Sequence, residues 1–171
     1  NTYDDLWLAL KKEGYRENET LFAFPYDWTL SNRENALKLR EKIREVKNLT
    51  GFGKVDLVAH SMGGLDARYY VENRSYEGDV DKLIMLGTPN GGATMAPLIV
   101  KRGVAGSGIG NAGYNFLLAL FAAQLGYANV SAFAQSVASL GELFPVFDYL
   151  RNNSVLLPYP ESSERSILLE A

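Results

Sequence analysis

Val58-Ala59-His60-Ser61-Met62-Gly63-Gly64 joins the end of an apolar run to the start of a helical pattern. A nucleophilic serine on a sharp strand-to-helix turn needs small residues two positions before and after it, and Ala59 and Gly63 meet that steric requirement. Such a turn exposes the hydroxyl at the carboxyl edge of a sheet and aims the first amides of the helix at developing negative charge. The pattern predicts Ser61 as a nucleophile and the backbone N–H of Met62 as an oxyanion donor.

The alternative interpretation of Ser61 is an ordinary helix N-cap, because serine is common at that position. A bare G-x-S-x-G pattern does not separate the two interpretations. Here the expected context stands on both sides of the serine, with an apolar strand before it and a helical period after it. This context favours the nucleophile.

The only histidine of the chain, His60, is adjacent to the predicted nucleophile. A general base must reach the serine hydroxyl within about 2.6–3.2 Å, whereas neighbouring side chains on a strand point to opposite faces. We therefore predict a structural role for His60 and no complete Ser-His-acid triad in these residues. The acid Asp148 has no predicted strand before it, which argues against a triad role.

Apolar runs and helical stripes around this motif alternate along the first half of the chain. Strands are predicted at 21–25, 55–59 and 82–86, and helices at 3–10, 32–46 and 62–72. Ser31 and Glu34 form a capping-box signature at the start of the second helix. Strands that alternate with helices are typical of an α/β fold with a parallel sheet and crossover helices.

Charge divides the chain into two parts. Residues 1–82 contain 15 acidic and 13 basic residues, whereas residues 103–141 contain none. We predict a core with the nucleophile at 1–100 and a lid- or cap-like, mostly helical part of the same domain at 101–171. Glycines between 103 and 113 could serve as hinges, so this charge-free segment (103–141) is either buried as internal helices or a mobile lid that turns its apolar face toward lipid.

Composition excludes several classes of protein. A chain of 171 residues has room for about one domain. A net charge of −3 and a pI near 5.2 argue against nucleic-acid binding. With no cysteine and one histidine, we expect no metal site and no cofactor. The G-x-G-x-x-G match at 108–113 lacks a clear preceding strand and a following acid, which argues against dinucleotide binding.

Neither a signal-peptide pattern nor an apolar run of the ~20 residues needed for a membrane span occurs in these residues. The compartment is therefore left open. In the serine-first arrangement, the acid and the histidine follow the nucleophile along the chain. We expect them outside these residues, and we expect the chain alone to be nearly inactive.

The sequence resembles the lecithin:cholesterol acyltransferase family of α/β-hydrolases over residues 1 to about 100. The segments that carry the resemblance are Gly14-Tyr15, Phe24-Pro25-Tyr26-Asp27-Trp28, the Ala59-to-Gly64 motif and Leu86-Gly87-Thr88-Pro89-Asn90-Gly91-Gly92. The resemblance implies acyl-ester chemistry on lipids through an acyl-serine at Ser61, with Met62 as an amide donor. It also implies that this chain is the central part of the fold, truncated at both ends.

Two residues of the loop after the first predicted strand have two interpretations each. The resemblance places Asp27 and Trp28 near the acyl site. Composition alone favours an aspartate that orders the loop and a tryptophan that fills the core. Thr29 stands where the family has an arginine, and the family cysteines are missing, so details of substrate specificity do not carry over.

The sequence thus predicts a serine esterase, lipase or O-acyltransferase that acts on lipid acyl esters. The expected partners are a lipid or acyl-ester substrate and a transient lipid interface. Two alternatives stay open: a non-catalytic lipid- or partner-binding module on a hydrolase scaffold, and another serine hydrolase such as a deacylase or thioesterase.

Overall fold

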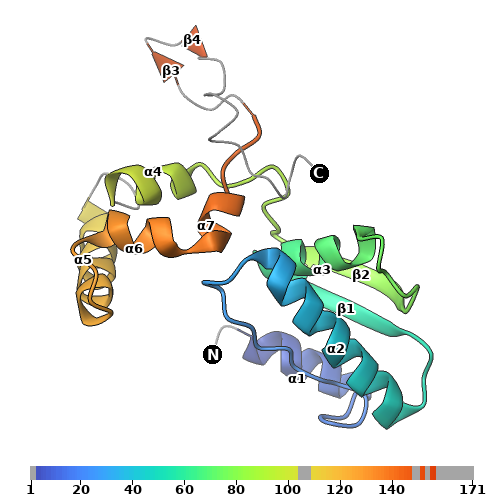
Figure 1. The fold of residues 1–171 in the computed structure, drawn as a ribbon. Coiled ribbons are helices and arrows are strands. Elements are labelled where there is room, and N and C mark those ends of the chain that lie inside the picture. The colour runs from blue at the N-terminus through green and yellow to red at the C-terminus, as the bar shows by residue number, and fades with distance from the viewer. Residues whose placement is uncertain (1–2, 104–108, 148–150, 153–154, 157–171) are drawn as a thin grey trace.

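A computed structural model describes residues 3–103, 109–147, 151–152 and 155–156 (Figure 1). Its elements follow one another along the chain as α1 (Asp4–Lys12), α2 (Asn32–Thr50), β1 (Val55–His60), α3 (Gly63–Glu72), β2 (Val80–Leu86), α4 (Met95–Arg102), α5 (Ile109–Gln124), α6 (Val130–Ser136), α7 (Ala138–Glu142), β3 (Arg151–Asn152) and β4 (Val155–Leu156). No helix in these described ranges is both long and apolar enough to cross a bilayer.

Strands β1 and β2 form a two-stranded parallel sheet, with α3 as the crossover between them (Figure 1). Leu57 pairs with Leu83 and His60 with Leu86. The β-branched and aliphatic residues of both strands suit a pleated, covered surface. The predicted α/β pattern of strand, crossover helix and parallel strand is confirmed here.

The strand predicted at 21–25 is wrong. Leu21 makes a single isolated bridge to Glu17, and the segment that follows has no assigned strand in the part of the chain that the structure describes. Because a strand exists only by pairing its backbone with a neighbour, an apolar run is not enough. Phe24 nevertheless packs against the core, which explains the apolar character of the run.

The first core lies between α2, α3 and the sheet. Its buried members are Ala36, Leu39, Ile43, Ala67 and Tyr70, and the inward side chains of β1 pack against them. Ala36, Leu39 and Ile43 form the inward stripe of α2, at the helical spacing that the sequence predicts. The helix continues to Thr50, beyond the predicted range of 32–46, and ends because Gly51 adopts a left-handed C-cap with φ 74°.

The start of α2 differs from the predicted capping box. Ser31 Oγ accepts a hydrogen bond from the backbone N–H of Arg33, at 3.1 Å, while the Glu34 side chain is exposed. The carboxylate of Glu142 takes the expected place of Glu34. It accepts hydrogen bonds from the Ser31 hydroxyl, at 2.5 Å, and from the backbone N–H of Asn32, at 2.7 Å.

Helices α4 to α7 gather around a second core (Figure 1). Ala122, Val130, Phe133 and Val137 are its buried members. The sequence pattern at 132–140 predicts one helix, whereas the structure divides it into α6 and α7 at Val137, whose ψ of 104° is not helical. The predicted glycine connection is shorter than expected, because α5 already includes Gly110 and Gly113. Residues 104–108, Asp148 and the predicted turn at Pro158 and Pro160 lie outside the described residues.

Backbone hydrogen bonds fasten the second core to the first. The backbone N–H of Ala138 donates to the carbonyl of Thr29 at 3.2 Å, and that of Ala93 donates to the carbonyl of Leu143 at 2.7 Å. At the second contact, Gly92 has φ 87°, and a Cβ there would lie 2.4 Å from the carbonyl oxygen of Phe144. Only glycine fits this position.

Candidate functional site

Ser61 lies between the end of β1 and the start of α3 in a strained backbone conformation. Its φ is 53°, a left-handed value that is uncommon for a non-glycine residue. The backbone N–H of Ser61 donates to the carbonyl of Leu86 in β2 at 2.9 Å, so the sheet itself holds the turn. Such strain persists only where surrounding structure imposes it, and it is concentrated at functional sites.

The side chain of Ser61 does not cap α3. The N-cap position of α3 is Met62, and the structure gives this helix no side-chain cap hydrogen bond. Ser61 contributes its carbonyl instead, which accepts from the backbone N–H of Gly64 at 3.0 Å. The N-cap interpretation of Ser61 is therefore wrong. Ser61 is exposed at the end of β1.

Two segments that are distant from Ser61 in sequence approach this turn closely. A Cβ on Gly64 would lie 1.8 Å from Oγ1 of Thr88, which belongs to the segment after β2. A Cβ on Gly63 would lie 3.4 Å from the ring of Tyr26. The small residues after Ser61 thus allow two distant loops to approach the turn closely.

Tyr26 brings the loop before α2 to the turn. Its ring stacks with that of Phe24, with centroids 6.2 Å apart. Burial raises the pKa of Tyr26, and together with smaller contributions from the nearby Asp66 and Tyr3 it brings the pKa to about 12. The phenol is therefore neutral and available as a hydrogen-bond donor near Gly63.

Asp27 orders the loop that follows Tyr26. Its Oδ1 accepts hydrogen bonds from the backbone N–H of Thr29, at 3.0 Å, and from the hydroxyl of the same residue, at 2.6 Å. These two hydrogen bonds lower the pKa of Asp27, and the bond from the Thr29 hydroxyl has the larger effect. Thr29 thus has a local structural role where the family has an arginine.

Trp28 does not fill the core, which corrects the composition-based interpretation. The residue is 41% exposed, and its ring meets that of Phe133 edge-on at 6.3 Å. Its carbonyl accepts a short hydrogen bond from the hydroxyl of Ser139. Trp28 therefore lies where the first core meets the helical part.

His60 is held by a residue far from it in sequence. Its Nδ1 lies 3.1 Å from the hydroxyl of Tyr3, and the two rings meet edge-on. His60 is on the outward side of β1, because inward and outward residues alternate along that strand. This arrangement agrees with the structural role predicted for it.

The most unusual acid of the site, Asp66, was missed by the sequence reasoning. It lies in the first turn of α3, is 1% exposed, and neither carboxyl oxygen has a hydrogen-bond partner among the described residues. Burial raises its pKa to about 8, and the negative charge of Glu142 adds to the shift. Asp66 is therefore a protonated acid at neutral pH.

Two buried asparagines at the start of α2 also have polar atoms without a hydrogen-bond partner in the described structure. Asn32 and Asn35 are both fully buried, and the amide oxygen of each is one of these atoms. The Nδ2 group of Asn35 donates to the carbonyl of Asp27 at 2.9 Å. The sequence offers one signal for this acidic pair, because Glu142, which acts on Asp66, is the first charged residue after the charge-free segment.

A cavity of about 450 Å³ lies along β1 beside the turn. Its walls include Tyr26, Gly63 and Asp66, and much of the rest is apolar or aromatic. No group of three or more metal-ligating side chains occurs in the residues that the structure describes. The chemistry this geometry offers is that of a strained serine beside helix amides.

The comparison with known proteins agrees with this geometry. The sequence profile of the lecithin:cholesterol acyltransferase family matches residues 1–158, which is most of the chain. The chain belongs to that family. This membership agrees with the resemblance carried by the Ser61 motif and by the loop around Asp27.

Several curated proteins are similar to this chain at moderate identity. The human lysosomal phospholipase A and acyltransferase is 38% identical over 97 residues, 53% of this chain and 23% of the relative. Phospholipase A(1) LCAT3 of Arabidopsis thaliana is 36% identical over 84 residues, 47% of this chain and 19% of the relative. Triacylglycerol lipase 2 of Saccharomyces cerevisiae is 33% identical over 103 residues, 56% of this chain and 31% of the relative. The matches thus span less than a third of these relatives.

Proposed function

We propose that the complete protein is a serine esterase, lipase or O-acyltransferase that acts on lipid acyl esters. The observation that carries this proposal is the left-handed φ of 53° at Ser61, at a strand-to-helix turn of a family member. The named relatives are lipid hydrolases and acyltransferases. In this proposal, the described residues form the central part of an α/β-hydrolase fold, and α4–α7 form its lid or cap.

The reaction begins when Ser61 Oγ attacks the ester carbonyl carbon. The carbonyl oxygen becomes an oxyanion that the backbone N–H of Met62 helps to stabilise. Collapse of this intermediate expels the alcohol, which leaves with a proton, and an acyl-serine remains. The acyl group is then transferred to water or to a second alcohol, and the Ser61 hydroxyl is restored. The proton is carried by a histidine outside these residues, because His60 is bound to Tyr3. This chain alone is therefore expected to hydrolyse esters near background.

Asp27 and Trp28 form the loop that borders the acyl site in this proposal. The contact between Trp28 and Phe133 supports it, because it joins the loop to the helical part that would cover a bound acyl chain. Asp27 fixes the course of the loop through its two bonds to Thr29.

We also propose that the helical part contacts lipid through α5. Five large apolar residues in this helix or directly after it are exposed: Phe116, Leu117, Leu120, Phe121 and, one residue past the end of the helix, Leu125. This set is called the α5 apolar face below. Exposed apolar patches of this kind mark interaction surfaces more often than ordinary solvent-facing structure.

The nucleophile is tested with a fluorophosphonate probe on the complete protein. The probe should label Ser61, and Ser61→Ala should abolish labelling. Ser75→Ala, which changes an exposed serine in the loop after α3, is the matched control and should be labelled like the parent. Labelling that persists in a folded Ser61→Ala protein would contradict the proposal, and an unlabelled parent would favour a non-catalytic lipid-binding module.

A further inference from the structure

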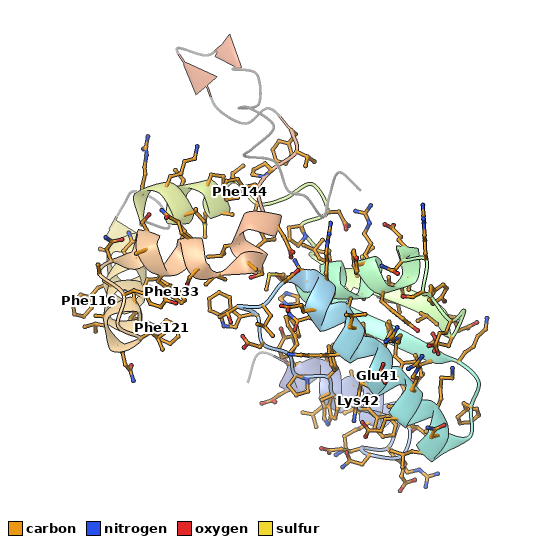
Figure 2. The ribbon with its side chains drawn as sticks, in the orientation of Figure 1. Glu41, Lys42, Phe116, Phe121, Phe133 and Phe144 are labelled. Atoms are coloured by element: carbon orange, nitrogen blue, oxygen red, sulfur yellow. The ribbon has the colours of Figure 1, made fainter. Side chains whose placement is uncertain are left out.

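One member of the α5 apolar face, Phe121, contacts the second core through the ring of Phe133, at 5.5 Å, whereas Phe116 and Leu117 do not belong to that core. Phe116 and Leu117 are 64% and 63% exposed, while Ala122 on the opposite side of the helix is fully buried. Figure 2 shows Phe116 at the outer side of α5, away from Phe133, which is a residue of α6. The helix therefore packs through one side and offers its other side to a partner.

Two basic residues lie next to this face. Lys101 and Arg102 occupy the last turn of α4, and their residues are exposed. Together with Ala119 and Ala123 of α5, they line an open pocket of about 450 Å³. Since Phe116, Ala119 and Ala123 follow the spacing i, i+3, i+7, they share one side of the helix. Lys101 and Arg102, the basic rim, thus adjoin the α5 apolar face.

The charge of the helical part is one-sided. Residues 93–147 contain three charged residues, which are Lys101, Arg102 and Glu142. Glu142 is directed at the start of α2, where it accepts hydrogen bonds from Ser31 and Asn32. Within residues 93–147, the charges next to the apolar face are therefore both positive, although the chain as a whole has a net charge of −3.

We propose that the α5 apolar face and the basic rim together bind bilayers that contain anionic phospholipid. The inference rests on the proposed lipid contact of α5. It adds that this surface prefers lipids whose headgroups carry a negative charge. Apolar side chains enter the headgroup boundary, and basic side chains at its edge attract anionic lipid. Each basic residue close to such a surface strengthens binding about five- to sixfold, so the pair gives a preference of about 30-fold at low salt.

The experiment measures cosedimentation of this chain with two kinds of vesicle, phosphatidylcholine alone and phosphatidylcholine mixed with phosphatidylserine. The parent should prefer the anionic vesicles by about 30-fold at low salt, and salt should weaken that preference. Lys101→Gln with Arg102→Gln should remove the preference and keep binding to neutral vesicles. The matched control is Lys11→Gln with Lys12→Gln, which changes two neighbouring basic residues in the last turn of α1. This control should keep the preference for anionic vesicles.

Phe116→Ser with Leu117→Ser should abolish binding to both kinds of vesicle, with the circular-dichroism spectrum and melting temperature unchanged. Equal binding of the parent to both vesicles, or a preference that survives loss of the basic rim, would overturn this inference and leave the proposed reaction at Ser61 untouched. Absence of any vesicle binding would overturn the lipid contact of α5 as well. A stable dimer that Phe116→Ser dissociates would assign the face to a second copy of the chain and also overturn the inference.

Discussion

Asp66 is a buried carboxylic acid whose stability effect depends on pH in a definite direction. Its pKa is about 8 in the folded chain against 3.8 for an unperturbed aspartate. Between these values the folded state holds a proton that the unfolded state has released. The contribution of Asp66 to stability is therefore fully present below about pH 4 and is lost as the pH rises through about 8.

The prediction at this residue is that Asp66→Asn removes that loss. Between about pH 5 and pH 9, the free energy of unfolding of the parent should fall by about 2–4 kcal/mol more than that of the variant. Urea unfolding at the two pH values measures this difference. Asp56→Asn, at an aspartate with an exposed side chain, is the control and should keep the slope of the parent. Parallel slopes for the parent and the Asp66 variant would contradict the buried-acid assignment.

At the scale of elements, α7 and α2 are joined through Glu142. Its carboxylate accepts from the Ser31 hydroxyl and from the first backbone N–H of α2. A negative charge is stabilising at a helix N-terminus, because the unpaired amides there carry partial positive charge. One side chain therefore stabilises the start of α2 and fixes α7 against the first core.

We expect Glu142→Ala to lower the free energy of unfolding by about 1–3 kcal/mol, since it removes two hydrogen bonds to a charged acceptor. It should also increase hydrogen exchange at Ala138, whose N–H donates to Thr29. Glu34→Ala tests the capping box directly and should change stability by less than about 0.5 kcal/mol. A larger effect at Glu34 than at Glu142 would show that the local cap forms in solution.

At the scale of the whole molecule, the described residues form two cores, and α2 and α7 contact each other between them (Figure 1). Phe133 is central to the second core, where its ring contacts those of Trp28, Phe121 and Tyr127. The first core, around Leu39 and Tyr70, shares none of its buried members with the second. The two parts can therefore differ in local stability.

Phe133→Ala should destabilise the helical part by about 3–5 kcal/mol, because it leaves a cavity among aromatic rings. Limited proteolysis should then cut first within α5 and α6, while α2, α3 and the sheet stay protected in hydrogen exchange. Phe116→Ala, at an exposed position on α5, is the control and should change neither measurement. Simultaneous loss of protection in both parts would contradict the presence of two separable cores.

Local pattern alone was sufficient for the turn at Ser61, for the helix that ends at Gly51 and for the parallel pair β1 and β2. In these cases the residue types fix the backbone: an apolar strand, small residues at a turn, and a glycine that adopts a left-handed φ. The family resemblance was also readable from these short segments, and the match over residues 1–158 confirms it.

Distant partners decided the rest. The apolar run at 21–25 does not become a paired strand, because pairing depends on which backbone lies alongside. The cap of α2 comes from Glu142, more than a hundred residues away in sequence and brought there by the docking of α7. The pKa of Asp66 depends on burial beneath α2 and on that same glutamate. Spacing along a chain specifies backbone conformation, whereas burial and charge proximity arise only when separate elements pack together.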